Sequence, residues 1–135
     1  MKRLFLILAS LGLLAAMAVL YAAEKPKSII HVVTLKYKDG TTDTQKKAVL
    51  DGIEKMSREI PGITHVWLKS TKVQGGYPLK QSDGEYKVVP MTDAFVMEFK
   101  DEAAFKAYAD HPAHKEWEKA YIEVRDRSVT SDITN

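Results

Sequence analysis

Two segments of the chain would have apolar side chains on both faces if they formed β-strands. They run from Ile29 to Tyr37 and from Asp93 to Phe99, and both are rich in β-branched and aromatic residues. A strand whose sheet has one face in water alternates apolar with polar residues, and these two strands do not. We therefore expect a sheet with two covers, helices over one face and a second copy of the chain over the other.

Three helices are expected between and after these strands. The first follows a capping box formed by Thr42 and Gln45, and Pro61-Gly62 ends it. Asp101 caps the second, and Pro112 begins the third, because proline suits the first helical position. Apolar residues recur in these helices at the helical spacing: Val49, Leu50, Ile53, Met56 and Ile60, then Ala104, Phe105 and Tyr108, then Ala113, Trp117, Ala120, Tyr121 and Val124.

Two more strands complete the expected sheet, one from Ile63 to Val73 and one from Ser128 to Ile133. Between the second and third strands lies a long polar connection, residues 74–91, with a hairpin expected around Asp83-Gly84. The resulting order is β-α-β-β-α-β. With right-handed crossovers, this order predicts an α+β protein of the ferredoxin-like arrangement, an antiparallel sheet with its helices on one face.

Residues 1–23 have the pattern of a secretory signal peptide. Met1-Lys2-Arg3 is the charged start, Leu4 to Leu20 is the apolar run, and Ala16-Met17-Ala18 fits a cleavage site. The alternative is an uncleaved anchor, because the run approaches the length of about 20 residues that spans a bilayer. We expect cleavage. It would leave a mature chain that begins near residue 19 to 24, with residues 24–135 as one periplasmic or secreted domain without stable membrane association.

Composition excludes several classes of site. The chain has no cysteine, so disulfides, thiol nucleophiles, cysteine-bound zinc and iron–sulfur centres are excluded. The formal net charge is +2, and Lys2 and Arg3 of the predicted signal contribute to it. No basic stripe is visible in the remaining sequence, so nucleic acid is not an expected partner.

The strongest candidate site lies between Phe105 and His114. The helical pattern stops before Pro112 and begins again there, which places Tyr108 and His114 at one joint between two helical segments. A neutral histidine can remove a proton beside a carbonyl group. A tyrosine hydroxyl can orient that carbonyl or hold the enolate oxygen that forms.

The chain resembles the stress-responsive A/B-barrel (Dabb) family over Ile30 to about Ile133. Five segments carry the resemblance: HVVTLK at 31–36, KDG at 38–40, IPGI at 60–63, the stretch 99–108 and His111-Pro112-Ala113-His114. Members of the family are dimeric α+β barrels with a pocket between sheet and helices in each protomer. The resemblance therefore implies a homodimer and such a pocket here. Most members of the family have no assigned reaction.

The chain is also similar to the family's olivetolic acid cyclase-type members, which close a linear polyketide by an aldol condensation without a cofactor. This similarity implies an acid/base role for His114, a partner role for Tyr108 and a place in the site for His31, with no cofactor. Two features depart from the cyclase. Its pocket tyrosine falls at Ile53, and the 74–91 connection is longer than usual in the family. Both departures bear on the substrate.

Two functions remain open from the sequence. In the first, the protein binds a small hydrophobic or carbonyl ligand beside the His-Pro-x-His motif and performs no chemistry. In the second, it is a cofactor-free enzyme, cyclase-like or lyase-like, that uses His114 and Tyr108. A purely structural interpretation is that His111 caps a helix and His114 packs under the sheet. A metal held by His111 and His114 is a further alternative, which no acidic ligand motif supports.

Overall fold

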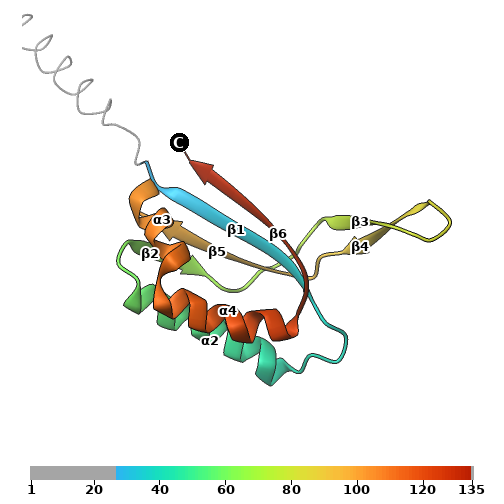
Figure 1. Cartoon of the computed structure of the whole chain (residues 1–135), viewed down its shortest axis with the longest axis horizontal. Coiled ribbons are helices and arrows are strands. Elements are labelled where there is room, and N and C mark those ends of the chain that lie inside the picture. Colours follow the sequence, from blue (N-terminus) through green and yellow to red (C-terminus); the bar gives the residue numbers. More distant parts are fainter. Residues whose placement is uncertain (1–26, 135) are drawn as a thin grey trace, which may run out of the picture.

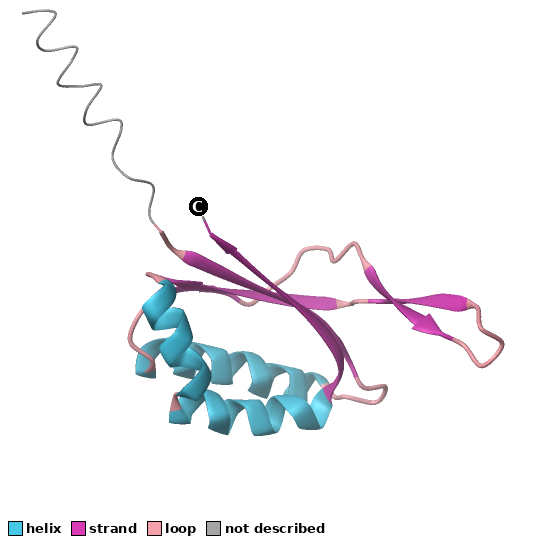
Figure 2. Ribbon diagram, turned by 45° about the horizontal axis from the view of Figure 1, so that its top comes forward, coloured by secondary structure: helices cyan, strands magenta, loops and turns pink. Residues whose placement is uncertain are grey.

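The computed structural model describes residues 27–134, which form an antiparallel sheet with three helices on one face (Figure 1 and Figure 2). The sheet has four strands in the order β2-β5-β1-β6, and β3 and β4 form a separate hairpin. The elements are β1 Ile29–Tyr37, α2 Asp43–Glu59, β2 Ile63–Trp67, β3 Gly76–Lys80, β4 Tyr86–Pro90, β5 Asp93–Phe99, α3 Glu102–Asp110, α4 Pro112–Val124 and β6 Arg125–Thr134. The predicted ferredoxin-like order is confirmed, with the hairpin as an addition.

Short-range sequence signals set the starts of the helices. The Thr42 hydroxyl accepts a hydrogen bond from the Gln45 amide at 3.2 Å, and the Gln45 side chain accepts one from the Thr42 amide at 2.9 Å. The Asp101 carboxylate accepts from the Ala104 amide at 2.7 Å at the start of α3. Pro112 occupies the first turn of α4. All three starts are as predicted, because each depends on residues within one turn.

Two strands differ in length from their predictions. The strand expected from Ile63 to Val73 ends at Trp67, where its pairing with β5 stops. The strand expected from Ser128 to Ile133 instead runs over Arg125–Thr134, because it pairs with β1 along the whole length of that strand. The length of a strand depends on the strand with which it pairs, and the β-propensities of its residues do not determine that partner.

The connection at 74–91 contains the β3–β4 hairpin, which projects from the sheet (Figure 1). Its turn includes the predicted Asp83-Gly84 pair, and Gly84 has a φ of +92° that favours glycine. At the base of the hairpin, the Arg127 guanidinium lies 4.9 Å from the centre of the Tyr77 ring. The hairpin is therefore joined to β6 by a cation–π contact.

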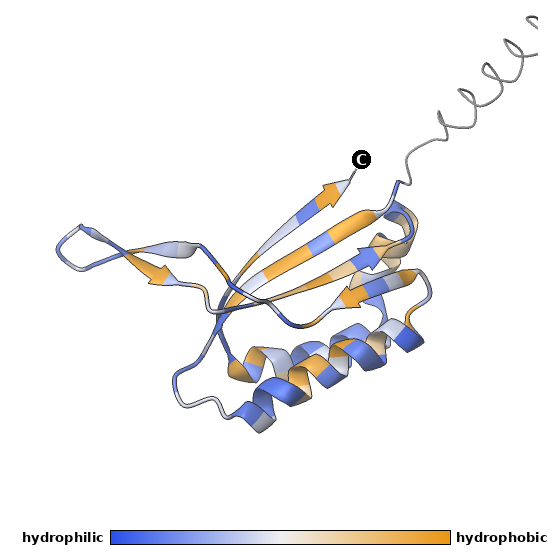
Figure 3. Cartoon of the chain, turned by 180° about the vertical axis from the view of Figure 1, so that it is seen from behind, coloured by the Kyte–Doolittle hydropathy of each residue, from blue (hydrophilic) through white to orange (hydrophobic). Residues whose placement is uncertain are grey.

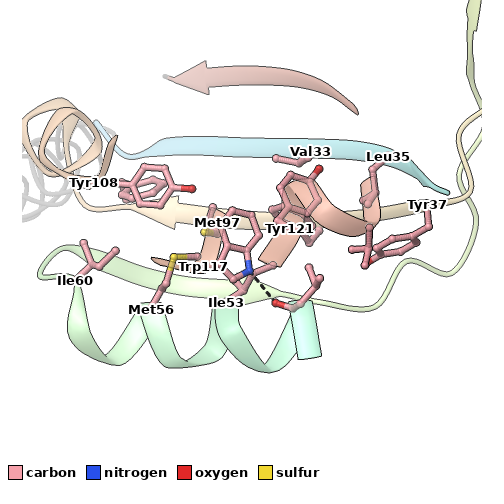
Figure 4. Close-up of a cluster of buried hydrophobic side chains, with 14 of the residues drawn as sticks. Val33, Leu35, Tyr37, Ile53, Met56, Ile60, Met97, Tyr108, Trp117 and Tyr121 are labelled. Atoms are coloured by element: carbon pink, nitrogen blue, oxygen red, sulfur yellow. Dashed lines mark hydrogen bonds between the residues drawn. The ribbon is translucent and has the colours of Figure 1, made fainter. Parts of the chain in front are cut away.

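The core lies between the sheet and the helices (Figure 4). Trp117 of α4 donates a hydrogen bond from Nε1 to the Val49 carbonyl of α2 at 2.9 Å. The two helices approach this closely because Gly52 has no side chain, and a Cβ there would lie 2.5 Å from Trp117 Cδ1. The largest fully buried side chains are Phe95, Phe99, Leu35, Ile53, Met56, Met97 and Val49.

The opposite face of the sheet has no cover among residues 27–134. Val32 on β1 and Val96 on β5 are partly buried there. Trp67, Val129 and Ile133 are exposed at 51%, 44% and 56%. Figure 3 shows apolar residues along the central strands when the molecule is seen from behind. The prediction of strands that are apolar on both sides is therefore confirmed, and the described residues cover one side only.

The predicted signal peptide, residues 1–23, lies outside the described residues, and so does the expected domain start at residue 24. Of the helices that the structure does describe, none combines the length and the apolar character needed to span a membrane. Export and cleavage therefore stay predictions.

Candidate functional site

A cavity of about 590 Å³ opens between the sheet and helices α3 and α4. The three residues predicted from the sequence, His31, Tyr108 and His114, all line it. Phe95 and Trp117 contribute an apolar wall, with their rings edge to face at 5.9 Å. The structure thus gathers residues from β1, α3 and α4 around one space, which Trp117 borders without filling.

The joint between α3 and α4 sets the relation of Tyr108 to His114. His111 has an extended backbone, its amide donates to the Tyr108 carbonyl at 3.1 Å, and its Nδ1 accepts from the Ala113 amide at 3.2 Å. His111 therefore ends one helix and caps the next, as the structural interpretation of this histidine predicted. The bend places the rings of Tyr108 and His114 with their centres 4.1 Å apart.

The protonation of His114 follows from one hydrogen bond. Its Nδ1 lies 3.2 Å from the Ala109 carbonyl oxygen, which can only accept, so Nδ1 carries the proton. The other ring nitrogen, Nε2, then holds the lone pair of the neutral imidazole. Burial lowers the pKa of His114 below its usual value, and the Ala109 contact and the charge of Glu118 oppose this effect. The ring is therefore a neutral base at physiological pH.

Tyr108 provides a proton donor at the same place. Its side chain is 5% exposed, and burial raises the pKa of its hydroxyl well above the usual value, with a further contribution from the negative charge of Glu118. The hydroxyl points into the layer between helices and sheet (Figure 4). It stays protonated over the physiological range, so a neutral base and a neutral donor lie side by side.

His31 has a partner that the sequence did not reveal. Its Nδ1 lies 2.6 Å from Oδ1 of Asp132, the residue opposite it in the β1–β6 pairing. The imidazole also packs against the rings of Phe105 and Tyr108, with centres 5.6 and 5.9 Å apart. Asp132 lies in a segment that was predicted as a strand, but only the register of that strand with β1 brings its carboxylate to His31.

Two expectations about the pocket can be compared with the geometry. Ile53, which stands where the cyclase has a pocket tyrosine, is fully buried in the core and is not among the residues that line the cavity. In the described part of the chain, no group of three or more histidine, aspartate or glutamate side chains converges in a way that could hold a metal ion. His111 and His114 instead face the Ala113 amide and the Ala109 carbonyl.

A larger hollow of about 930 Å³ shares Phe105 and Lys106 with this cavity in its lining. Asp132, Ile133 and Ile29 line it, together with the first turn of α3. It includes none of His31, Tyr108 and His114. The three residues predicted for the site thus line the smaller hollow, and Phe105 borders both.

Solved structures share this fold. Hydroxynitrile lyase from Passiflora edulis has a TM-score of 0.65 and 15% identity over 82% of this chain and 95% of its own. A Dabb family protein from Mesorhizobium loti has a TM-score of 0.57 and 23% identity, and the match covers 81% of this chain and 97% of its own. A dimeric ferredoxin-like protein of unknown function from Thermobifida fusca has a TM-score of 0.59 and 21% identity, with 82% of this chain and 93% of its own covered. At these identities the likeness establishes the ferredoxin-like fold.

The sequence comparisons give the family. No curated protein matches the chain. The model of one domain family, the Stress Responsive A/B Barrel Domain, matches residues 29–135, from the first residue of β1 onward. The match spans the sheet, the helices and the His111–His114 joint, and it confirms the resemblance found from the sequence. The chain belongs to the stress-responsive A/B-barrel (Dabb) family.

Proposed function

We propose that this protein is an exported homodimer that binds a small hydrophobic molecule bearing a carbonyl group in the cavity beside His111–His114. The observation that carries the proposal is the cavity itself. Its volume of about 590 Å³ falls within the range of roughly 300–1,000 Å³ that is typical of small-molecule sites. Apolar and aromatic side chains such as Phe95 and Trp117 form its walls, with a few polar groups between them.

The carbonyl group is inferred from the polar pair at the α3–α4 joint. The protonated Tyr108 hydroxyl can donate a hydrogen bond, and a carbonyl oxygen can accept it without supplying a donor of its own. Nε2 of the neutral His114 carries a lone pair and can take up a proton from the ligand. A neutral, hydrophobic ketone therefore suits this pairing of a donor with a base.

Trp117 offers a direct assay. The chain has two tryptophans, and Trp67 lies on the outer face of the sheet, so Trp67→Phe leaves Trp117 as the single reporter on the cavity wall. Methyl nonyl ketone should change the Trp117 emission in a saturable way. Tyr108→Phe should weaken this binding about fivefold, the loss expected for one hydrogen bond. Tyr86→Phe on the exposed hairpin is the matched control. A ketone that leaves the emission unchanged would refute the proposal.

A second function is favoured by the tautomer of His114. Nε2 can remove a proton from the carbon beside the ligand's carbonyl, and the electrons of that C–H bond then move to the oxygen, where the Tyr108 hydroxyl stabilises the enolate. In a ligand with a second carbonyl, the enolate carbon attacks it, a C–C bond forms, and the imidazolium returns its proton to the new alkoxide. The hydroxynitrile lyase from Passiflora edulis shares this fold, which supports the proposal that the scaffold can carry an enzyme.

Proton exchange tests the enzyme hypothesis without knowledge of the substrate. In deuterated buffer, the parent protein should accelerate the loss of the proton signals beside the carbonyl of methyl nonyl ketone. His114→Ala should abolish the acceleration, and Tyr108→Phe should reduce it roughly 10²-fold, as expected for the loss of an oxyanion contact. Exchange at the buffer rate in the parent, together with saturable binding, would leave the protein as a binder only.

Two observations support the remaining parts of the proposal. The charged start and apolar run of residues 1–23 support export, and the intact mass of protein recovered from the cell envelope would show whether the segment is removed. The uncovered apolar face of the sheet supports the homodimer, and so does the likeness to the dimeric Thermobifida fusca protein. Full-length protein held in the membrane would contradict cleavage.

A further inference from the structure

The end of the cavity away from His114 is built by the last turn of α4 and the start of β6. Tyr121, Arg125 and Ser128 line this end. His114 and Arg125 are eleven positions apart along α4 and its C-terminal cap, which corresponds to about 16 Å of helix rise. The cavity thus has two polar ends, with the rings of Phe95 and Trp117 between them.

Arg125 is a cation without an acidic partner in the described chain. Its guanidinium lies 5.2 Å from the centre of the Tyr121 ring and donates to the Ser128 hydroxyl at 3.1 Å. No carboxylate of residues 27–134 pairs with it, whereas the neighbouring Arg127 and Lys36 both approach Asp126, at 3.9 and 3.7 Å. A guanidinium has five N–H donors in a planar fork that matches a carboxylate, and most of these donors stay free here.

The Tyr121 hydroxyl is a second unused donor at this end. The side chain is 5% exposed, and its hydroxyl is buried and makes no hydrogen bond of regular geometry within the described structure. Burial raises the pKa of Tyr121, and the nearby Ser128 hydroxyl and Arg125 guanidinium oppose this effect, so the phenol stays protonated beside these two side chains. Figure 4 shows it directed toward Val33 on β1, in the layer that holds the cavity. Buried hydroxyls normally have an acceptor for their proton, and the described residues offer this O–H none in regular geometry, so an acceptor supplied by a ligand would complete the group.

The charges around the cavity are arranged asymmetrically. On the side of His114 the cavity is lined by Lys106, which pairs with Glu102 at 2.7 Å, and by Asp110, which pairs with Lys115 at 3.2 Å. Glu118 is the lining residue of that side without an ion pair among the described residues, so an anionic group is disfavoured near His114 and attracted at Arg125. The uncharged donor Tyr108 remains suited to a neutral carbonyl.

We infer that the ligand of this cavity is an amphipathic oxo acid, whose carboxylate is bound by Arg125, Ser128 and the Tyr121 hydroxyl while its carbonyl group faces Tyr108 and His114. The apolar body of the ligand lies along Phe95 and Trp117. This inference rests on the proposed function, because it names the chemical class of ligand for the same cavity. It adds a recognition end that lies apart from the histidines.

Decanoate and decanol separate the carboxylate from the apolar chain. With Trp67→Phe as the parent, the emission of Trp117 reports occupancy for both probes. Decanoate should bind at least about tenfold more tightly than decanol, the gain expected for a charge-assisted hydrogen bond. Arg125→Met should remove this preference while decanol keeps its affinity to within about twofold, and Tyr121→Phe should reduce it in part.

Arg127→Met is the matched control, because Arg127 neighbours Arg125 on β6 but stacks on Tyr77 and does not line the cavity. It should leave the preference for decanoate intact. Arg125→Lys should restore only part of the preference, since an ammonium keeps the charge and loses the fork. If Arg125→Met does not fold, judged by circular dichroism, Ser128→Ala together with Tyr121→Phe replaces it.

The outcomes distinguish this inference from the proposed function. Equal binding of decanoate and decanol in the parent, or an equal loss of both in Arg125→Met, would overturn the carboxylate end and leave hydrophobic binding standing. Failure of decanoate, decanol and methyl nonyl ketone to change the Trp117 emission would overturn both. A preference for decanoate that disappears with Arg125→Met and survives Arg127→Met would support the inference.

Discussion

Replacing Gly52 by alanine should destabilise the protein, although alanine is the better helix former. The substitution gains about 1 kcal/mol of helix propensity. The new Cβ would lie 2.5 Å from Trp117 Cδ1, and such overpacking costs about 1–3 kcal/mol. Displacing the indole also strains its 2.9 Å hydrogen bond to the Val49 carbonyl, worth about 1 kcal/mol. The free energy of unfolding should therefore fall by about 1–3 kcal/mol.

Urea unfolding followed by circular dichroism measures this difference. Gly75→Ala is the matched control, because a Cβ at Gly75 meets nothing within 4 Å, and its effect should be neutral or slightly stabilising. Since Trp117 forms a wall of the cavity, Gly52→Ala should also weaken the binding of methyl nonyl ketone. A Gly52→Ala protein as stable as the parent, or more stable, would refute the argument that the close approach of α2 and α4 depends on the missing side chain.

Two further predictions concern pH and assembly. Burial lowers the folded-state pKa of His114 below the unfolded value of about 6.5, so the unfolded state binds the proton more readily, and the unfolding free energy should decline as the pH falls below about 6.5. Urea unfolding measured from roughly pH 7.5 to 5 should show a shallower decline for His114→Gln than for the parent. An unchanged slope would contradict the assignment. Val32→Lys on the outer face of the sheet should convert the dimer into a folded monomer, as measured by light scattering, because it places a charge in an interface of roughly 800 Å² per partner. Ile122→Lys changes an exposed apolar residue on α4 and should leave the dimer intact. A monomeric parent would contradict the argument that a second copy covers the outer face.

The local sequence was sufficient for much of the fold. The helix starts at Thr42, Asp101 and Pro112 depend on contacts within one turn, and all three were predicted. The joint that brings Tyr108 to His114 was also predicted, because Pro112 breaks the helical pattern at a defined place. The bounds of β1 and β5 followed from their continuous apolar runs.

Features that depend on pairing between distant segments were not predicted. The full length of β6 follows from its ladder with β1, which joins residues about a hundred positions apart. The same ladder places Asp132 beside His31, and a register shifted by one residue would put that carboxylate on the opposite face of the sheet. Neither strand contains a signal that specifies this register by itself.

The candidate site shows the same division. The sequence by itself determined which groups meet at the α3–α4 joint, since a proline and the residues around it suffice to bend the chain there. Only the tertiary structure decided that Arg125, Ser128 and Tyr121 form the other end of the same cavity. The reason is physical. Helix caps and breaks are set by contacts within a few residues, whereas the walls of a cavity depend on how a helix packs on a sheet and on which strand lies at its edge.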